Sequence, residues 1–253
     1  MNNNLIIQKT SSEEGRFGEI IAKCFYDNYQ ELGGENKLFF NSNVIDTTKN
    51  KNFQKIDCDF IDVNSNFLIE VKHDTWIAGK KDKYPNGTGN LTYEFATWVP
   101  KSLTNQIKNY IKNFDIIFLS DILNQFPQLT LNHVGCNQKC MAHQIFLIGG
   151  EEEFPENKKY KLKNIWAISN FKLKNFINSI PIKTSFSPNN IWLRFTYHKE
   201  DNNYNLLIII PIQLLIFKNI ATQIPVAMQN AFLQKYPCFQ SYHSSQELEY
   251  LIN

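Results

Sequence analysis

Two acidic residues, a lysine and a histidine end an apolar run, FLIEVKHD, at residues 67–74. Just upstream, FQKIDCDFID places Asp57 and Asp59 between apolar neighbours. Mg²⁺ prefers oxygen ligands and commonly takes one or two carboxylates, leaving its other positions to water and phosphate oxygens. A lysine beside such an ion can orient an attacking water and stabilise charge that builds on phosphorus. These residue types therefore indicate phosphodiester chemistry; the alternative is an exposed hairpin face with cross-strand Lys-Asp pairs.

The segment FQKIDCDFIDVNSNFLIEVKHD predicts a β-hairpin, because two β-branched or aromatic runs flank the turn-rich DVNSN. With the turn centred between residues 64 and 65, Asp59 lies opposite Glu70 and Asp57 lies opposite Lys72. These four residues then share one face of the hairpin. The other face is apolar and carries Ile56, Cys58, Phe60, Phe67, Ile69 and Val71. A slip of one residue would mix the two sets, so the pattern favours this register.

An amphipathic helix is predicted upstream, over SSEEGRFGEIIAKCFYDNYQELGG. Ser11 and Glu14 have the spacing of a capping box, and Gly33 is a natural stop. The apolar stripe at helical spacing is Phe17, Ile20, Ile21, Cys24, Phe25 and Leu32. Glu19 stands at the edge of a neighbouring face of small residues that could approach a sheet closely. Glu19 either faces the side chains of the sheet or is a solvated glutamate on an amphipathic helix.

The hairpin residues IDCDFID and FLIEVK resemble the PD-(D/E)XK nuclease superfamily, whose pattern is an aspartate, a hairpin turn and Glu-x-Lys at the end of an apolar strand. The segment GRFGEIIAKCFY resembles the first-helix motif of that superfamily, in which a glutamate after a small residue faces the metal site. This resemblance implies such a place for Glu19. TGNLTYEFATW, at residues 88–98, resembles a strand of phage and plasmid members, and the resemblance makes Glu94 the matching acid.

A second helix is predicted over SLTNQIKNYIKNF, with Ser102 as its N-cap. Its core stripe is Leu103, Ile107, Tyr110, Ile111 and Phe114. Gln106 stands at the edge of that stripe. QIKNY resembles the Gln-xxx-Tyr motif of RecB-like nucleases, in which the glutamine helps to position the site or the strand; the alternative is a core-flanking amide. DIIFLSD then predicts a short buried strand.

The order helix, hairpin, strand, helix, strand suits a mixed sheet with helices on its faces. We therefore expect an α/β (α+β) protein, and the resemblance implies a restriction-endonuclease-like mixed central sheet flanked by helices. The resemblance covers roughly residues 12–120. We expect a nuclease core at 1–130 and a C-terminal α+β extension at 131–253, which could complete the sheet, read DNA sequence or make a homodimer.

The second half carries no motif that names a family. Its HVGCNQKCMAHQ segment has residue types that can bind zinc, with buried thiols as the alternative: His133, Cys136, Cys140 and His143. IWLRFTYHKEDNNYNLLIIIP predicts a second hairpin, in which Arg194 and His198 share a face that is either a nucleic-acid surface or a half-solvated strand. IATQIPVAMQNAFLQKY, broken or begun by Pro225, and SQELEYLIN predict helices.

The composition argues against a membrane-spanning, a secreted or a disulfide-stabilised protein. The 253 residues have a net charge of +2, and no apolar run approaches the ~20 residues needed to cross a bilayer. The MNNNLIIQKT start lacks the apolar region of a signal peptide. Five scattered cysteines favour reduced thiols over a disulfide framework. We expect a cytoplasmic protein without a membrane partner.

The residues and the resemblance together predict a Mg²⁺-dependent DNA endonuclease, with Mn²⁺ as a substitute, that hydrolyses duplex or branched DNA by metal-activated water. A phage, restriction-type or mobile-element setting follows from the resemblance. The expected metal ligands are Asp57, Asp59, Glu70, Glu19 and Glu94, and the expected catalytic residues are Asp57, Glu70, Lys72, Glu19 and Gln106. Two alternatives stay open: an inactive nucleic-acid-binding protein on a nuclease-like core, and a partner-binding structural domain.

Overall fold

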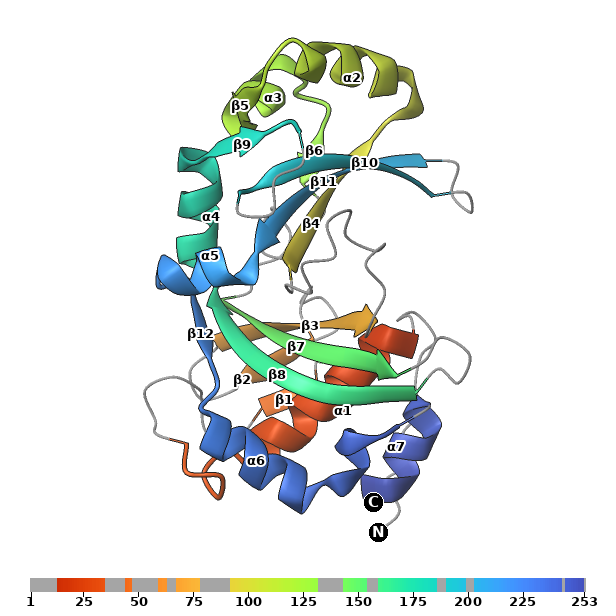
Figure 1. The fold of residues 1–253 in the computed structure, drawn as a ribbon, viewed down its shortest axis with the longest axis vertical. Helices are drawn as coiled ribbons and strands as arrows, with labels where there is room; N and C mark the ends of the chain where they lie inside the picture. The colour runs from red at the N-terminus through yellow and green to blue at the C-terminus, as the bar shows by residue number, and fades with distance from the viewer. Residues whose placement is uncertain are drawn as a thin grey trace.

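The chain folds into two mixed sheets and the helices that cover them (Figure 1). The computed structural model describes residues 13–34, 44–46, 59–62, 67–77, 92–131, 143–153, 159–185, 190–198, 203–242 and 244–252. The presence of two mixed sheets together with helices confirms the expected α/β (α+β) class. Within these ranges, no helix is long and apolar enough to cross a membrane.

The first sheet carries the predicted hairpin, in the strand order β1-β2-β3-β7-β8-β12. Its strands are β1 (Val44–Asp46), β2 (Phe60–Asp62), β3 (Phe67–Ile77), β7 (Gln144–Glu153), β8 (Lys159–Ser169) and β12 (Ala221–Gln223). β3 and β7 are parallel, and the other neighbours are antiparallel. The sheet is therefore mixed, as the order of elements predicted.

The second sheet has the strand order β5-β9-β10-β11-β4-β6. Its strands are β4 (Thr92–Val99), β5 (Ile116–Phe118), β6 (Thr130–Leu131), β9 (Pro181–Lys183), β10 (Trp192–His198) and β11 (Asn203–Pro211). β10 and β11 form the predicted second hairpin, with Trp192 opposite Ile209 and His198 opposite Asn203. Both sheets take strands from both sides of residue 130, so the second half of the chain completes the first sheet.

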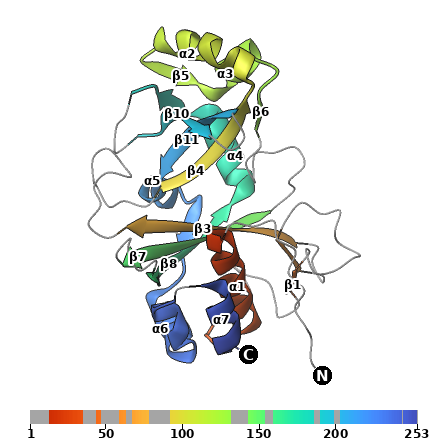
Figure 2. The same cartoon turned by 90° about the vertical axis from the view of Figure 1, so that its right-hand side faces the viewer.

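The helices cover the sheets in separate groups (Figure 2). They are α1 (Glu13–Asp27), α2 (Thr104–Lys112), α3 (Leu119–Gln125), α4 (Asn170–Ser179), α5 (Ile212–Phe217), α6 (Val226–Lys235) and α7 (Ser245–Ile252), with 3-10 turns η1 (Lys101–Leu103) and η2 (Pro237–Gln240). α1, α6 and α7 lie under the first sheet in Figure 1, α4 and α5 lie between the sheets, and α2 and α3 lie at the other end.

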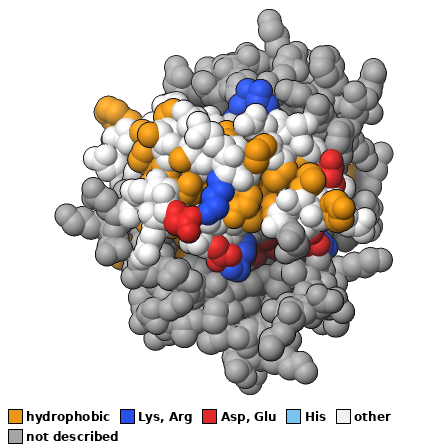
Figure 3. Space-filling view, turned by 90° about the horizontal axis from the view of Figure 1, so that it is seen from below, with side chains coloured by type: hydrophobic (Ala, Val, Ile, Leu, Met, Phe, Trp, Pro, Cys, Tyr) orange, Lys and Arg blue, Asp and Glu red, His pale blue; other side chains and the backbone are white. Residues whose placement is uncertain are grey.

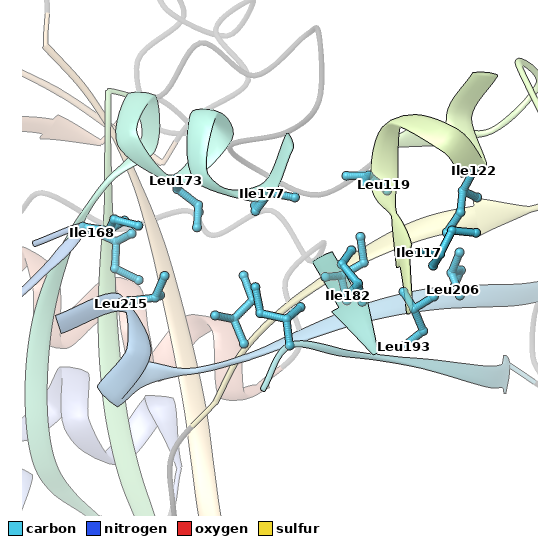
Figure 4. Packing of buried hydrophobic residues seen from close by; sticks show 14 of the residues in the cluster. Ile117, Leu119, Ile122, Ile168, Leu173, Ile177, Ile182, Leu193, Leu206 and Leu215 are labelled. Carbon is cyan, nitrogen blue, oxygen red and sulfur yellow. The ribbon is translucent and has the colours of Figure 1, made fainter. Parts of the chain in front are cut away.

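Alternating side chains of the first sheet enter two different cores. Phe146 and Ile148 of β7 join the cluster that contains α1, α6 and α7, whereas Ile145 and Leu147 join the cluster that contains α4, α5 and the second sheet. Figure 4 shows part of the latter cluster, in which Leu173 and Ile177 of α4 lie between the two sheets. The first sheet is thus buried on both faces around β7 and β8.

The underside of the molecule is held mainly by apolar contacts. Figure 3 shows hydrophobic side chains spread over its described surface, with a few charged side chains among them. Arg16 of α1 pairs with Glu249 of α7 at 2.8 Å, and Lys235 of α6 pairs with Glu31. The Lys235–Glu31 pair is exposed and contributes only about 0–1 kcal/mol, and the Arg16–Glu249 pair is partly buried, so the burial of apolar side chains of α1 against the sheet supplies most of the stability here.

The first predicted helix forms, but it ends earlier than its stop signal. Its predicted stripe is buried from Phe17 to Phe25, while Leu32 is only partly buried. α1 ends at Asp27 because the Asn28 side chain donates to the Cys24 carbonyl at 2.8 Å and takes the acceptor of the next helical turn. Gly33, with φ of 83°, closes the turn that follows. Ser11 of the predicted capping box lies outside the described residues.

Several local predictions in the middle of the chain need correction. The second helix begins at Thr104 instead of Ser102, because residues 101–103 form a 3-10 turn, and Phe114 of its stripe is 40% exposed. The segment DIIFLSD contributes the three-residue β5, in which only Ile117 is buried, before α3 begins at Leu119. Pro225 directly precedes α6, and α7 forms as predicted.

Candidate active site

The charged end of the hairpin is built on β3, whose side chains alternate between two faces. Ile69 and Val71 are buried in the cluster beneath α1. Glu70 and Lys72 therefore lie on the opposite face, beside Ile145 and Leu147 of the parallel strand β7. Apolar neighbours on the adjacent strand reduce the access of water to this pair of charges.

Glu70 and Lys72 form an ion pair, with Lys72 Nζ at 2.9 Å from Glu70 Oε1. The exposed fraction of the side chain is 9% for Glu70 and 33% for Lys72. Removing a carboxylate from water is unfavourable unless a cation or hydrogen-bond donors compensate for it. The lysine supplies that compensation and keeps an approach from solvent, which a reacting group needs.

The predicted hairpin register is confirmed where the structure describes it. Phe60 pairs with Ile69, and Asp62 pairs with Phe67. The pairing ends at Phe60, and Asp59 is tied to β3 by its own hydrogen bond to the residue after Glu70. Asp59 and the Glu70–Lys72 pair thus lie at the same end of the hairpin.

Asp59 is fixed by the backbone of β3. Its Oδ2 accepts a hydrogen bond from the Val71 amide at 2.7 Å. Because β2 begins only at Phe60, the carboxylate supplies the acceptor that a longer β2 would have offered at this point. The side chain of Asp59 is half-buried, and this hydrogen bond holds it against β3.

The remaining predicted metal ligands are Asp57, Glu94 and Glu19, and the structure describes the backbone of two of them. Asp57 lies outside the described residues. Glu94 lies on β4 of the second sheet, opposite Ile209 of β11. Glu19 is half-buried on α1, the helix that packs against the face of β3 opposite to Glu70 and Lys72.

Gln106 is exposed on α2. Both views of the fold put α2 at the far end of the molecule from β3, beyond the second sheet (Figures 1 and 2). The structure thus brings together Asp59, Glu70 and Lys72, and it does not bring Gln106 beside them. The exposed Gln106 next to the buried Ile107 fits the alternative of a core-flanking amide.

His143, from the predicted zinc cluster, supports the strands next to the site. Its Nδ1 accepts from the Leu68 amide at 3.0 Å, and its ring stacks on Phe67 with centroids 4.9 Å apart. The backbone also joins the two strands, with the His143 amide donating to the Leu68 carbonyl at 2.8 Å. His133, Cys136 and Cys140 lie outside the described residues. Among those that are described, no group of three His, Cys, Asp or Glu side chains could hold a metal ion.

Sequence reasoning missed the neighbour of the site, strand β7. The apolar segment QIFLIGG, at residues 144–150, has the composition of a strand, but local pattern cannot give its pairing partner, since 75 positions separate His143 from Leu68. The signal that could have found it is the run of apolar residues without alternation, which is typical of a strand in a parallel pair buried on both faces.

The donor set fits Mg²⁺ among the common metals. Asp59 and Glu70 offer carboxylate oxygens, which hard cations prefer, and Mg²⁺ is often bound by one or two carboxylates together with substrate phosphates. The lysine next to them can hold an anionic oxygen. Carboxylate oxygens with a neighbouring lysine are the groups that metal-dependent hydrolysis of a phosphodiester uses.

No family model, no curated protein and no solved structure matches the chain.

Proposed function

We propose that the protein is a metal-dependent nuclease of the PD-(D/E)XK type that hydrolyses phosphodiester bonds in DNA. One observation carries the proposal: Glu70 and Lys72 lie 2.9 Å apart on one face of β3, and Asp59 is bonded to the amide of the residue between them. A surface ion pair would not require a carboxylate as buried as Glu70. The sequence pattern of the hairpin predicted that these three residues, Asp59, Glu70 and Lys72, would lie together.

Each residue has a defined role in this proposal. Glu70, with Asp57 or Asp59, holds Mg²⁺, and Mn²⁺ substitutes for it. When bound, the ion lowers the pKa of coordinated water and offsets negative charge on the phosphate. Lys72 exchanges its contact with Glu70 for the attacking water and a phosphate oxygen. The water oxygen forms the new bond to phosphorus, one ester P–O bond breaks, and the leaving oxygen takes a proton.

Glu94 remains a proposed support of this site, on the resemblance alone. Glu19 is not retained, because α1 packs against the face of β3 opposite to Glu70 and Lys72. Gln106 has no part in the site, because α2 lies beyond the second sheet. A restriction-endonuclease-like core would comprise α1, the β2–β3 hairpin and the mixed first sheet, to which β7 and β8 of the second half contribute. A role in a phage, restriction system or mobile element, and assembly as a homodimer, belong to the same proposal.

The test is cleavage of plasmid, linear duplex and branched DNA in Mg²⁺, Mn²⁺, Ca²⁺ or EDTA. We expect cutting in Mg²⁺ and Mn²⁺ and none in EDTA. Ca²⁺ should support DNA binding without cutting, because it accepts oxygen ligands at longer distances and in looser geometry. Strong cutting in EDTA would contradict the metal mechanism. Absence of cutting on all three substrates, with intact binding, would favour the inactive nucleic-acid-binding alternative.

A further inference from the structure

Positive charge is concentrated in one part of the chain. Residues 157–246 contain eleven lysines and arginines and only two acidic residues, Glu200 and Asp201, although the whole chain has a net charge of +2. The remainder is correspondingly acidic. This segment runs through both sheets and α6, so what matters is where its lysines gather, and three of them, Lys172, Lys174 and Lys218, lie on α4 or just after α5. Lysines that gather on a surface attract polyanions, because phosphate neutralisation releases counterions.

Two helix ends from this segment meet on the surface. The Ser169 amide, just before α4, donates to the Ile220 carbonyl, which follows α5, at 2.9 Å. Lys172 Nζ donates to the Asn219 carbonyl at 3.0 Å. Asn219 has φ of 53°, the left-handed conformation that ends α5 and turns the chain toward α4. These contacts fix the start of α4 beside the end of α5.

Each of the two helix ends presents an exposed phenylalanine. Phe171 is 75% exposed and Phe217 is 77% exposed. The opposite side of α4 is the buried one, where Leu173 and Ile177 enter the core (Figure 4). Single exposed apolar residues are common, but phenylalanine has no polar group to hydrate, and here two rings lie on adjoining elements.

Lysines flank both rings. Lys172 follows Phe171 directly, and Lys218 places its Nζ 5.4 Å from the centroid of the Phe217 ring. Lys174 lies one step further along α4 and is half-buried. Exposed aromatic rings with adjacent cations form the surface that binds single-stranded nucleic acid, in which unpaired bases stack on the rings and phosphates approach the cations. A duplex keeps its bases stacked inside and cannot use the rings.

This surface is connected to the candidate active site. The Asn170 amide, at the start of α4, donates to the His143 carbonyl at 3.1 Å, and His143 is bonded to Leu68 of β3. Glu70 lies two residues along the same strand. These contacts place the start of α4 next to the beginning of β3, the strand that carries Glu70.

We propose that the ends of α4 and α5 bind single-stranded nucleic acid through Phe171, Phe217 and the lysines beside them. Delivery of the bound strand to Glu70 and Lys72 rests on the proposed function, whereas the binding itself does not. The consequence for a nuclease is a preference for branched substrates that carry an unpaired strand.

The experiment is fluorescence anisotropy with a labelled oligo(dT) in EDTA, where no metal-dependent cutting occurs. The double variant Phe171→Ala/Phe217→Ala should lose at least about tenfold in affinity, because each stacked base depends on its ring. The variant Phe171→Trp/Phe217→Trp should retain binding. Tyr250→Ala, a control at the 84% exposed tyrosine of α7, should bind as the wild type does. Thermal unfolding of each variant reports whether the fold is kept.

The results separate this inference from the proposed function. Wild-type protein that cuts duplex plasmid in Mg²⁺ but does not bind oligo(dT) overturns the inference alone. Equal binding by the wild type and the double alanine variant also overturns it. Binding of phosphatidylserine vesicles without any binding of oligo(dT) would assign the surface to a membrane and overturn it. Ring-dependent binding of oligo(dT) supports it, even in a protein that cuts nothing.

Discussion

The ion pair with Glu70 determines how much stability a substitution of Lys72 removes. Removing one partner of a fully buried ion pair costs roughly 3–5 kcal/mol, because the other charge is left without compensation. Lys72 is a third exposed, so water screens this pair and the loss should be nearer ~1 kcal/mol. Activity and stability therefore report on different properties of the lysine, and a variant at residue 72 can remain folded.

The two aspartates that precede Glu70 should differ in their importance. Asp57 lies outside the described residues, and the register predicted from the sequence would set it beside Lys72, toward the open end of the hairpin where a phosphate would enter. We expect Asp57→Asn to remove DNA cleavage and Asp59→Asn to leave a measurable remainder. An asparagine at 59 can still accept the Val71 amide, whereas Asp59→Ala should also lose about 1–3 kcal/mol of stability with that hydrogen bond.

Initial rates of plasmid cleavage and urea unfolding of the three variants measure these differences. The opposite ranking of Asp57→Asn and Asp59→Asn would make Asp59 the main metal ligand. Full activity in both asparagine variants would contradict the proposed constellation.

The burial of α1 against the first sheet has a consequence for stability at high pH. Burial, and then the nearby charge of Asp27, raise the pKa of the Cys24 thiol from 9.0 to about 12. The unfolded chain loses this proton at lower pH than the folded protein does. The stability that the protonated Cys24 thiol gives the folded protein is therefore complete below pH 9. It is lost progressively as the pH rises toward 12, by up to about 1.4 kcal/mol per pH unit.

We expect the free energy of unfolding of Cys24→Ala to fall less than that of the wild type between pH 9 and pH 10.5. Tyr26, whose pKa burial raises well above its usual value, acts in the same direction in both proteins, so the difference isolates the thiol. Urea titrations monitored by circular dichroism at each pH give the two slopes. Parallel slopes would show that Cys24 is accessible to solvent.

Local pattern predicted the hairpin and the first helix, and it could not predict how the strands assemble. The alternation around Asp59 and Glu70 contained enough information for the register, because only one register separates charged from apolar residues. The pairing of Glu70 with Ile145 depends on contacts across the long segment between them. The segment at residues 88–98 was predicted as a strand without a partner, and β4 pairs with β11, since a strand pattern does not specify its neighbour.

The sequence likewise predicted only the part of the candidate site that lies within the hairpin. Glu70, Lys72 and Asp59 are close in sequence, and a hairpin is enough to bring them together. Gln106 depended on a short motif, and the burial of Ile107 and Ile111 instead ties its helix to the second sheet. Motifs that act through distant elements need the tertiary arrangement before their residues can be assigned.

At the scale of the molecule, the uneven charge should govern DNA binding. We expect affinity for a duplex, measured in Ca²⁺ by filter binding or anisotropy, to fall steeply as salt rises, because residues 157–246 hold most of the excess of lysine and arginine. Lys174→Gln/Lys218→Gln should reduce the slope of log affinity against log salt. Lys112→Gln, an exposed lysine of α2 outside this segment, serves as the control. A flat salt response of the wild type would favour the partner-binding alternative.

The central claim is that Lys72 acts in catalysis, and the most direct measurement is the cleavage rate of Lys72→Ala in Mg²⁺. It should be read beside thermal unfolding and beside Lys112→Ala. We predict that Lys72→Ala loses at least about a hundredfold in rate, about 2.7 kcal/mol in barrier terms, while it stays folded and Lys112→Ala cuts like the wild type. A folded Lys72→Ala protein whose rate stays within about tenfold of the wild type would make Lys72 a surface lysine and contradict the account.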